Sequence, residues 1–154
     1  MAETTPVAPI APVRKTITVR VETEQAFELF TREIGSWWPL ATHSVGLENS
    51  TGVSIGTSVG DQLVETLADG TTSVWGTVVR CEPPNVLALT WHAGRPADDA
   101  TLLEVRFTAG AAGGTVVELV HSGWERWADG LAHSEGYSEG WDIVLDRFAG
   151  RAAG

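Results

Sequence analysis

Alternation of apolar and polar residues is the feature that most constrains how this chain can fold. In "TLLEVRFTA", apolar side chains alternate with Glu104 and Arg106, and "TVVELVHSG" places Val117, Leu119 and His121 on one side. A period of two is typical of a half-buried β-strand, with one face toward a core and the other toward water. These two stretches therefore predict neighbouring strands of an antiparallel sheet.

Six such stretches follow one another from about residue 51, separated by turn signals. They are "GVSI", "DQLVETL", "TTSVWGTVVRCE", "VLALTWH", "TLLEVRFTA" and "TVVELVHSG". A seventh, "VRKTITVRVE" (13–22), precedes them and is followed by a short helix that we expect to begin with Thr23 as its N-cap and to end at Gly35. The order predicts seven strands in an antiparallel meander.

The last predicted element is a long amphipathic helix at roughly residues 131–149. Five residues recur at helical spacing and form one apolar stripe: Tyr137, Trp141, Val144, Leu145 and Phe148. A curved seven-stranded sheet wrapped around this helix would bury the stripe. We therefore expect the fold class α+β, with short helices after the first strand.

Composition and charge exclude several classes of protein. The chain has 10 basic and 20 acidic residues, a net charge of −10, which repels nucleic acid and anionic lipid. No apolar stretch approaches the length of a membrane span. Cys81 is the only cysteine, so no internal disulfide can form.

We expect a cytoplasmic, bacterial-type protein that is a monomer or a homodimer. Residues 1–12 are expected to form a disordered tail, and residues 13–150 one domain.

Three stretches resemble the START-like superfamily, also called the SRPBCC or helix-grip superfamily. They are "SWWPLATHSVG", "WGTVVRCEPPNVLALTWHAGRP" and "VELVHSGW…GWDIVLDRF". The most similar branch is the one named after the activator of heat-shock protein 90 ATPase. The resemblance covers Val13 to Ala149 and implies a curved sheet that grips the C-terminal helix around a deep cavity. Members mostly bind hydrophobic ligands, and some are aromatase/cyclases.

Seven tryptophans in 154 residues are the strongest signal for a ligand site. Flat aromatic faces suit a planar, ring-bearing apolar ligand, although the same residues could simply fill the core. We expect five of them to border the cavity: Trp37, Trp38, Trp75, Trp91 and Trp141. The other expected ligand contacts are His43, Glu65, Phe107, His121 and Tyr137. Trp124 and Trp127 are expected to cover the open end of the sheet.

Three titratable residues are candidates for acid–base chemistry. Strand parity turns His121 inward, where it could act on a ligand or end the strand as a structural residue. Glu65 is a buried carboxylate in one strand register and a surface charge in the other. His43 lies in a loop, either over the cavity mouth or in solvent. His92 should face away from its neighbour Trp91.

Other kinds of site lack their motifs. The four histidines, with His133 near the helical stripe, show neither HExxH nor paired i,i+4 spacing, so we expect no metal and no cofactor. By strand parity Cys81 shares a face with Trp75, Thr77 and Val79, as a small buried hydrophobe.

The leading hypothesis is binding of a small hydrophobic, ring-bearing molecule. The alternatives are a cyclase or dehydratase-type enzyme using the same pocket, and an interaction module that regulates a chaperone ATPase.

Overall fold

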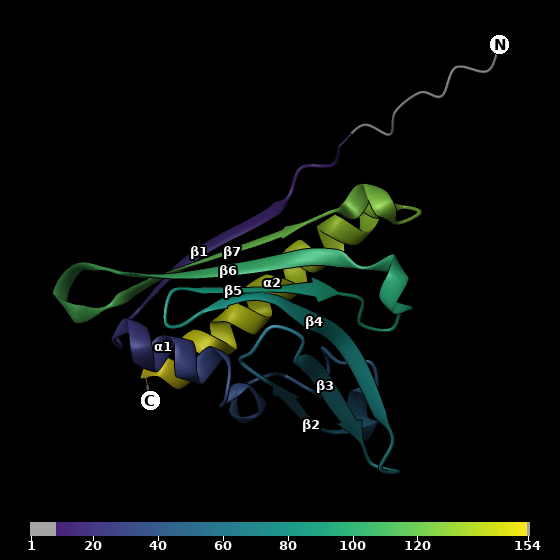
Figure 1. Cartoon of the computed structure of the whole chain (residues 1–154), viewed down its shortest axis with the longest axis horizontal. Helices are drawn as coiled ribbons and strands as arrows, with labels where there is room; N and C mark the ends of the chain where they lie inside the picture. Colours follow the sequence, from purple (N-terminus) through teal and green to yellow (C-terminus); the bar gives the residue numbers. More distant parts are fainter. Residues whose placement is uncertain (1–8, 154) are drawn as a thin grey trace.

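The computed structural model describes residues 9–153, in which a curved sheet lies along a long helix (Figure 1). The strands are β1 Val13–Val19, β2 Ser50–Ile55, β3 Gln62–Leu67, β4 Thr72–Glu82, β5 Val86–Trp91, β6 Thr101–Ala109 and β7 Thr115–Ser122. The α-helices are α1 Thr23–Phe30 and α2 Gly130–Ala153. Short 3-10 turns lie at Ile34–Ser36, Leu47–Asn49, Ala97–Asp99, Ala111–Gly113 and Trp124–Arg126. Most of the expected disordered tail, residues 1–8, lies outside the described residues.

The seven strands form one antiparallel sheet in the order β1-β7-β6-β5-β4-β3-β2. Strands β2 to β7 are a meander, and β1 joins the far edge by pairing with β7, where Val13 lies opposite His121. Helix α2 runs obliquely across one face of the sheet, and α1 lies beside its C-terminal part (Figure 1). The predicted α+β helix-grip architecture is confirmed.

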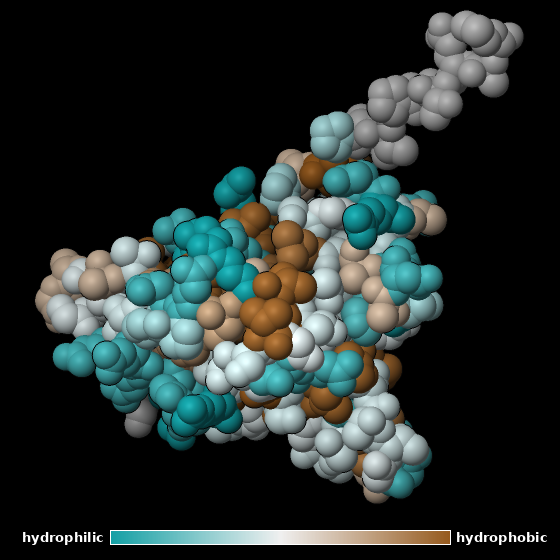
Figure 2. Space-filling view, viewed as in Figure 1, coloured by the Kyte–Doolittle hydropathy of each residue, from teal (hydrophilic) through white to brown (hydrophobic). Residues whose placement is uncertain are grey.

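The alternation in β6 divides the sheet into an inner and an outer face. Leu103, Val105 and Phe107 are buried, whereas Arg106 is exposed and Glu104 half-buried. Figure 2 shows one side of the molecule, where hydrophilic and neutral residues surround a few hydrophobic ones. The hydrophobic side chains of the inner face, together with those of both helices, make up the core.

Strand β4 bends the sheet, and its irregularities correct one sequence-based prediction. Its register shifts once against β3 and once against β5, and bulges of this kind bend and twist a strand. Trp75 and Val78 are buried, while Val79 is 47% exposed and Cys81 is half-buried. The shared face predicted for Trp75, Thr77, Val79 and Cys81 is therefore wrong, because each extra residue moves those after it to the other face.

Both α-helices differ from the prediction at their ends. Helix α2 runs from 130 to 153 instead of 131 to 149. A side chain at Gly130 would collide with the carbonyl of Trp124, so only glycine fits at the helix start. Helix α1 begins with Thr23 as its first helical residue rather than as its cap, and it ends where the Thr31 hydroxyl donates to the Phe27 carbonyl. No helix within residues 9–153 has both the length and the apolarity needed to cross a membrane.

Candidate ligand cavity

A cavity of about 640 Å³ lies between α2 and the inner side of the sheet. Trp75 of β4 and Trp91 of β5 form part of its wall, and α2 contributes residues between 132 and 144. The segment before β2 and the loop after β5 complete the wall at 38–45 and 93–94. Small-molecule sites typically occupy roughly 300–1,000 Å³, so this cavity has the size of a ligand site.

Four tryptophans from four different parts of the chain form one continuous surface of the cavity, the indole wall. Its members are Trp38, Trp75, Trp91 and Trp141. Ring centroids of neighbouring members lie 5.3–6.2 Å apart in tilted or edge-on arrangements. These are the separations that aromatic pairs prefer, so the four rings support one another.

Every indole N–H of the indole wall donates to another protein group. Trp38 donates to the carbonyl of His43 at 2.7 Å, and Trp75 donates to the Glu65 carboxylate at 2.9 Å. The Trp91 and Trp141 indoles donate at 3.0 Å, to the Tyr137 hydroxyl and to Nδ1 of His121 respectively. The side of the wall that borders the cavity therefore offers carbon surface rather than free polar groups.

The two loop tryptophans have different surroundings. Trp38 borders the cavity, but Trp37 packs against Phe30 and Phe148, with centroids 5.4 and 5.1 Å away. Trp37 therefore fills the core between α1 and α2, which corrects its predicted place in the cavity wall. Phe107 also lies away from the cavity, with its ring packed against α1.

Glu65 faces inward and is completely buried, which decides between its two possible registers. Its carboxylate accepts the backbone N–H groups of Val45 and Gly46 at 3.0 and 2.9 Å, besides the Trp75 indole. Burial raises the pKa of the Glu65 carboxyl, but the hydrogen bonds, with Gly46 the strongest among them, outweigh burial and hold the pKa below its usual value. Glu65 is thus an ionised anchor for the loop, and its surroundings do not support the predicted acid–base role.

His121 is also completely buried, and both of its ring nitrogens are engaged. Nδ1 accepts the Trp141 indole N–H, so Nε2 carries the proton of the neutral ring and donates to the Thr101 hydroxyl at 2.7 Å. That hydroxyl donates in turn to the carbonyl of Trp91 at 3.0 Å. Burial lowers the pKa of His121 to about 3. The ring joins α2 to β6 and β7, and its position does not support contact with a ligand or catalysis.

Five polar side chains remain at the cavity: His43, Ser44, His133, Tyr137 and Glu139. His43 is half-buried, with Nδ1 2.7 Å from the Thr42 hydroxyl, and it lies so close to α2 that a Cβ at Gly140 would contact its ring. Of the three residues predicted as acid–base candidates, His43 is the one that borders the cavity.

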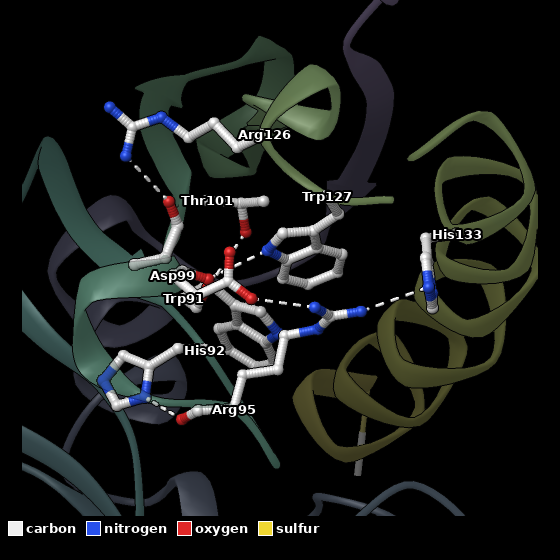
Figure 3. Close-up of polar contacts among 9 residues, drawn as sticks. Trp91, His92, Arg95, Asp99, Thr101, Arg126, Trp127 and His133 are labelled. Atoms are coloured by element: carbon white, nitrogen blue, oxygen red, sulfur yellow. Dashed lines mark hydrogen bonds and ion pairs between the residues drawn. The ribbon is translucent and has the colours of Figure 1, made fainter. Parts of the chain in front are cut away.

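Arg95 lies at the centre of a group of polar contacts that includes the cavity residue His133 (Figure 3). Its guanidinium donates to the Asp99 carboxylate at 2.8 Å and to Nε2 of His133 at 3.1 Å, and it lies 3.9 Å over the Trp127 ring. These contacts tie the first turns of α2 to the loop between β5 and β6.

His92 points away from the cavity, with Nδ1 3.0 Å from the carbonyl oxygen of Arg95. Within residues 9–153, no three His, Cys, Asp or Glu side chains gather as a metal-binding group.

Two glycines of α2 belong to the cavity and are missing from the sequence-based site. Gly136 and Gly140 lie one turn apart and line the cavity beside Tyr137 and Trp141. Glycine costs about 1 kcal/mol relative to alanine inside a helix. Two glycines at i,i+4 beside the apolar stripe therefore signal that space is needed there, and this signal was available in the sequence.

A family model described as "Activator of Hsp90 ATPase homolog 1-like protein" matches residues 20–153. The chain belongs to this family. The matched region contains the complete cavity, from the segment before β2 to α2. No curated protein sequence matches the chain.

Solved structures similar to this family member include one with substantial sequence identity. It is described as an anthrahydroquino-γ-pyrone synthase, Txn09, in complex with a molecule designated SUM. The two sequences are 32% identical, the match covers 92% of this chain and 97% of that chain, and the TM-score is 0.62. CalU16 from Micromonospora echinospora is 19% identical over 90% and 73% of the two chains, with a TM-score of 0.60. DynU16, from the dynemicin biosynthetic locus, is 19% identical over 92% of this chain and 46% of its own, with a TM-score of 0.67. The last two likenesses show the fold alone.

Proposed function

We propose that this protein binds a small, planar, apolar molecule in the cavity between the sheet and α2. The indole wall is the observation that carries this proposal. The four tryptophans pack against one another, and together they border a volume of about 640 Å³. Because their N–H groups all bond to the protein, a ring-bearing ligand would bury its faces against carbon, and burial of apolar surface is favourable by about 25 cal/mol per Å².

The test is titration with indane, a flat hydrocarbon, followed through the indole N–H signals in nitrogen–proton NMR spectra. We expect the signals of Trp38, Trp75, Trp91 and Trp141 to shift more than that of Trp37, which lies in the core. Failure of indane to shift any indole-wall signal at its solubility limit would refute the proposal.

A matched pair of α2 variants locates the binding site. A Cβ atom added at Gly136 or at Gly150 would meet open space, but of the two only Gly136 lines the cavity. Gly136→Leu should weaken indane binding at least about tenfold, equivalent to about 1.4 kcal/mol, by filling the cavity. Gly150→Leu should bind like the wild type. Equal effects of the two variants would place the ligand elsewhere.

A second candidate function is cyclisation of an aromatic ketone, which is favoured by the relative that is named a γ-pyrone synthase. A γ-pyrone ring forms when a hydroxyl oxygen adds to the distal carbonyl carbon of a 1,3-diketone, its proton passes to that carbonyl oxygen, and water leaves. The test substrate is o-hydroxybenzoylacetone, which gives methylchromone and water by this route. If the protein forms methylchromone faster than the protein-free solution does, and His43→Ala reduces that rate, the second function is supported. If the protein does not change the rate, ligand binding is the one proposed function that stands.

The family's name refers to regulation of a chaperone ATPase. Neither the cavity nor the indole wall provides an argument for that role, so the proposal stays with the small molecule.

A further inference from the structure

Among the hydroxyl groups of the cavity residues, only that of Tyr137 accepts a hydrogen bond without donating one to the part of the chain that the structure describes. Its oxygen accepts the Trp91 indole N–H at 3.0 Å. Among residues 9–153, the hydroxyl donates no hydrogen bond to another protein group. A tyrosine hydroxyl both donates and accepts, so this one has a donor left to give. The indoles of the indole wall differ, since each has already used its single N–H.

The packing around Tyr137 holds its ring, and with it the hydroxyl oxygen, in one place. Its ring lies edge-on to His121 at 5.1 Å and against Trp124 at 5.1 Å, and both of these neighbours are fully buried. The hydroxyl oxygen is held at the junction between β5 and α2, where Trp91 and Tyr137 both border the cavity. Trp91 is therefore a positioning residue for the hydroxyl. A hydroxyl that accepts a hydrogen bond is also polarised into a better donor.

The hydroxyl remains protonated at neutral pH. Burial raises the pKa of Tyr137, and the Trp91 hydrogen bond and the charge of Arg95 only partly oppose that effect. Arg95 is itself paired with Asp99, and the carboxylate that lines the cavity is that of Glu139. Tyr137 thus presents a neutral O–H group to the cavity rather than a phenolate.

We propose that Tyr137 donates a hydrogen bond to a carbonyl oxygen of the ligand, so that the cavity selects planar aromatic ketones or quinones over the corresponding hydrocarbons. This inference rests on the proposed binding function. A hydrocarbon that covered the hydroxyl would strip it of water and leave its donor unpaired, whereas a ketone would complete its bonding. The indole wall would hold the ring system, and Tyr137 would set its orientation.

The experiment compares indane with indanone, which differ by one carbonyl group, on the wild type and on Tyr137→Phe. We expect the substitution to weaken indanone binding about fivefold, the range of a neutral hydrogen bond, and to change indane binding less than about twofold. Indane also controls for any local rearrangement around Trp91, whose N–H loses its acceptor in the variant. An equal change for both ligands would overturn the inference.

A spectroscopic measurement keeps the test independent of the variant's stability. A hydrogen bond from Tyr137 lowers the carbonyl stretching frequency of bound indanone below its value in a hydrocarbon solvent, and Tyr137→Phe should reverse this shift. An unshifted carbonyl band in the wild type would refute the inference while leaving the proposed function intact. Failure of both ligands to bind the wild type would instead refute the proposed function, and the inference with it.

Discussion

At the scale of single residues, Trp37 and Trp38 show how neighbours of the same type acquire different roles. Both lie in the segment that follows α1, where the chain turns at Ile34–Ser36. Trp37 donates its N–H to the Leu29 carbonyl at 2.7 Å and is held in the core, whereas Trp38 donates to the loop and turns toward the cavity. A single step along the chain therefore separates a place in the core from a place in the cavity wall.

Alanine substitutions should separate these two roles. Trp37→Ala opens a void in close-packed surroundings and should lower the free energy of unfolding by about 3–5 kcal/mol. Trp38→Ala enlarges an existing cavity and should cost less stability, but it should weaken indane binding more than about tenfold. Urea unfolding and the NMR titration measure the two quantities. The reverse order of stabilities would show that Trp38 is the core residue of the pair.

At the scale of elements, Glu65 of β3 holds the loop that forms one side of the cavity. Its carboxylate binds the consecutive N–H groups of Val45 and Gly46, and a side chain at Gly46 would collide with Leu67 and crowd the carboxylate. The anchored loop in turn supplies Trp38 with its acceptor, the carbonyl of His43. The shape of the cavity therefore depends on a contact behind its wall.

Glu65→Gln should loosen this loop. The amide has one accepting oxygen instead of two, and its NH₂ group would face N–H donors, so we expect a loss of about 2–4 kcal/mol in unfolding free energy. Hydrogen exchange at the Val45 and Gly46 amides should accelerate more than exchange in β6. Glu118→Gln, on the exposed face of β7, is the control and should leave both quantities unchanged. Unchanged exchange at both amides in Glu65→Gln would contradict the anchoring role.

At the scale of the whole molecule, His121 connects the sheet with the helix that it grips. The ring belongs to β7, donates to Thr101 of β6 and accepts from Trp141 of α2. Because Thr101 continues the chain of hydrogen bonds to the carbonyl of Trp91, three strands and one helix share a single buried polar network. The network is satisfied only while His121 is neutral.

This requirement makes stability depend on pH. The pKa of His121 is about 3 in the folded protein, against an ordinary value of 6.5. Below pH 6.5, His121 is therefore protonated in the unfolded chain but stays neutral in the folded protein. Stability should therefore fall as pH falls from 6.5 toward 3, by about 1.4 kcal/mol per pH unit and about 2 kcal/mol by pH 5.

His121→Asn provides the comparison, since it keeps an acceptor for Trp141 but cannot be protonated. The variant should be less stable than the wild type at pH 7, and the difference should shrink by about 2 kcal/mol between pH 7 and pH 5 in urea unfolding experiments. The carboxyl groups are the same in both proteins, so their effect on stability cancels in this difference. A pH-independent difference would mean that His121 has the same pKa in the folded and the unfolded protein.

The sequence by itself determined most of the strands, the meander from β2 to β7 and the gripped helix, whereas the pairing of β1 with β7 was decided by the tertiary structure. The strands and the helix follow from local periodicity, because a period of two in β6 or the stripe containing Trp141 leaves few ways to bury the apolar side. The tertiary structure decided the register of Glu65, the face of Cys81 and the different places of Trp37 and Trp38. The reason is physical: bulges in β4 reset strand parity, and the deciding hydrogen bonds join residues far apart in the chain, as between Glu65 and the backbone of 45–46 or between Trp91 and Tyr137. Such contacts exist only once the chain has folded, and no local pattern encodes them.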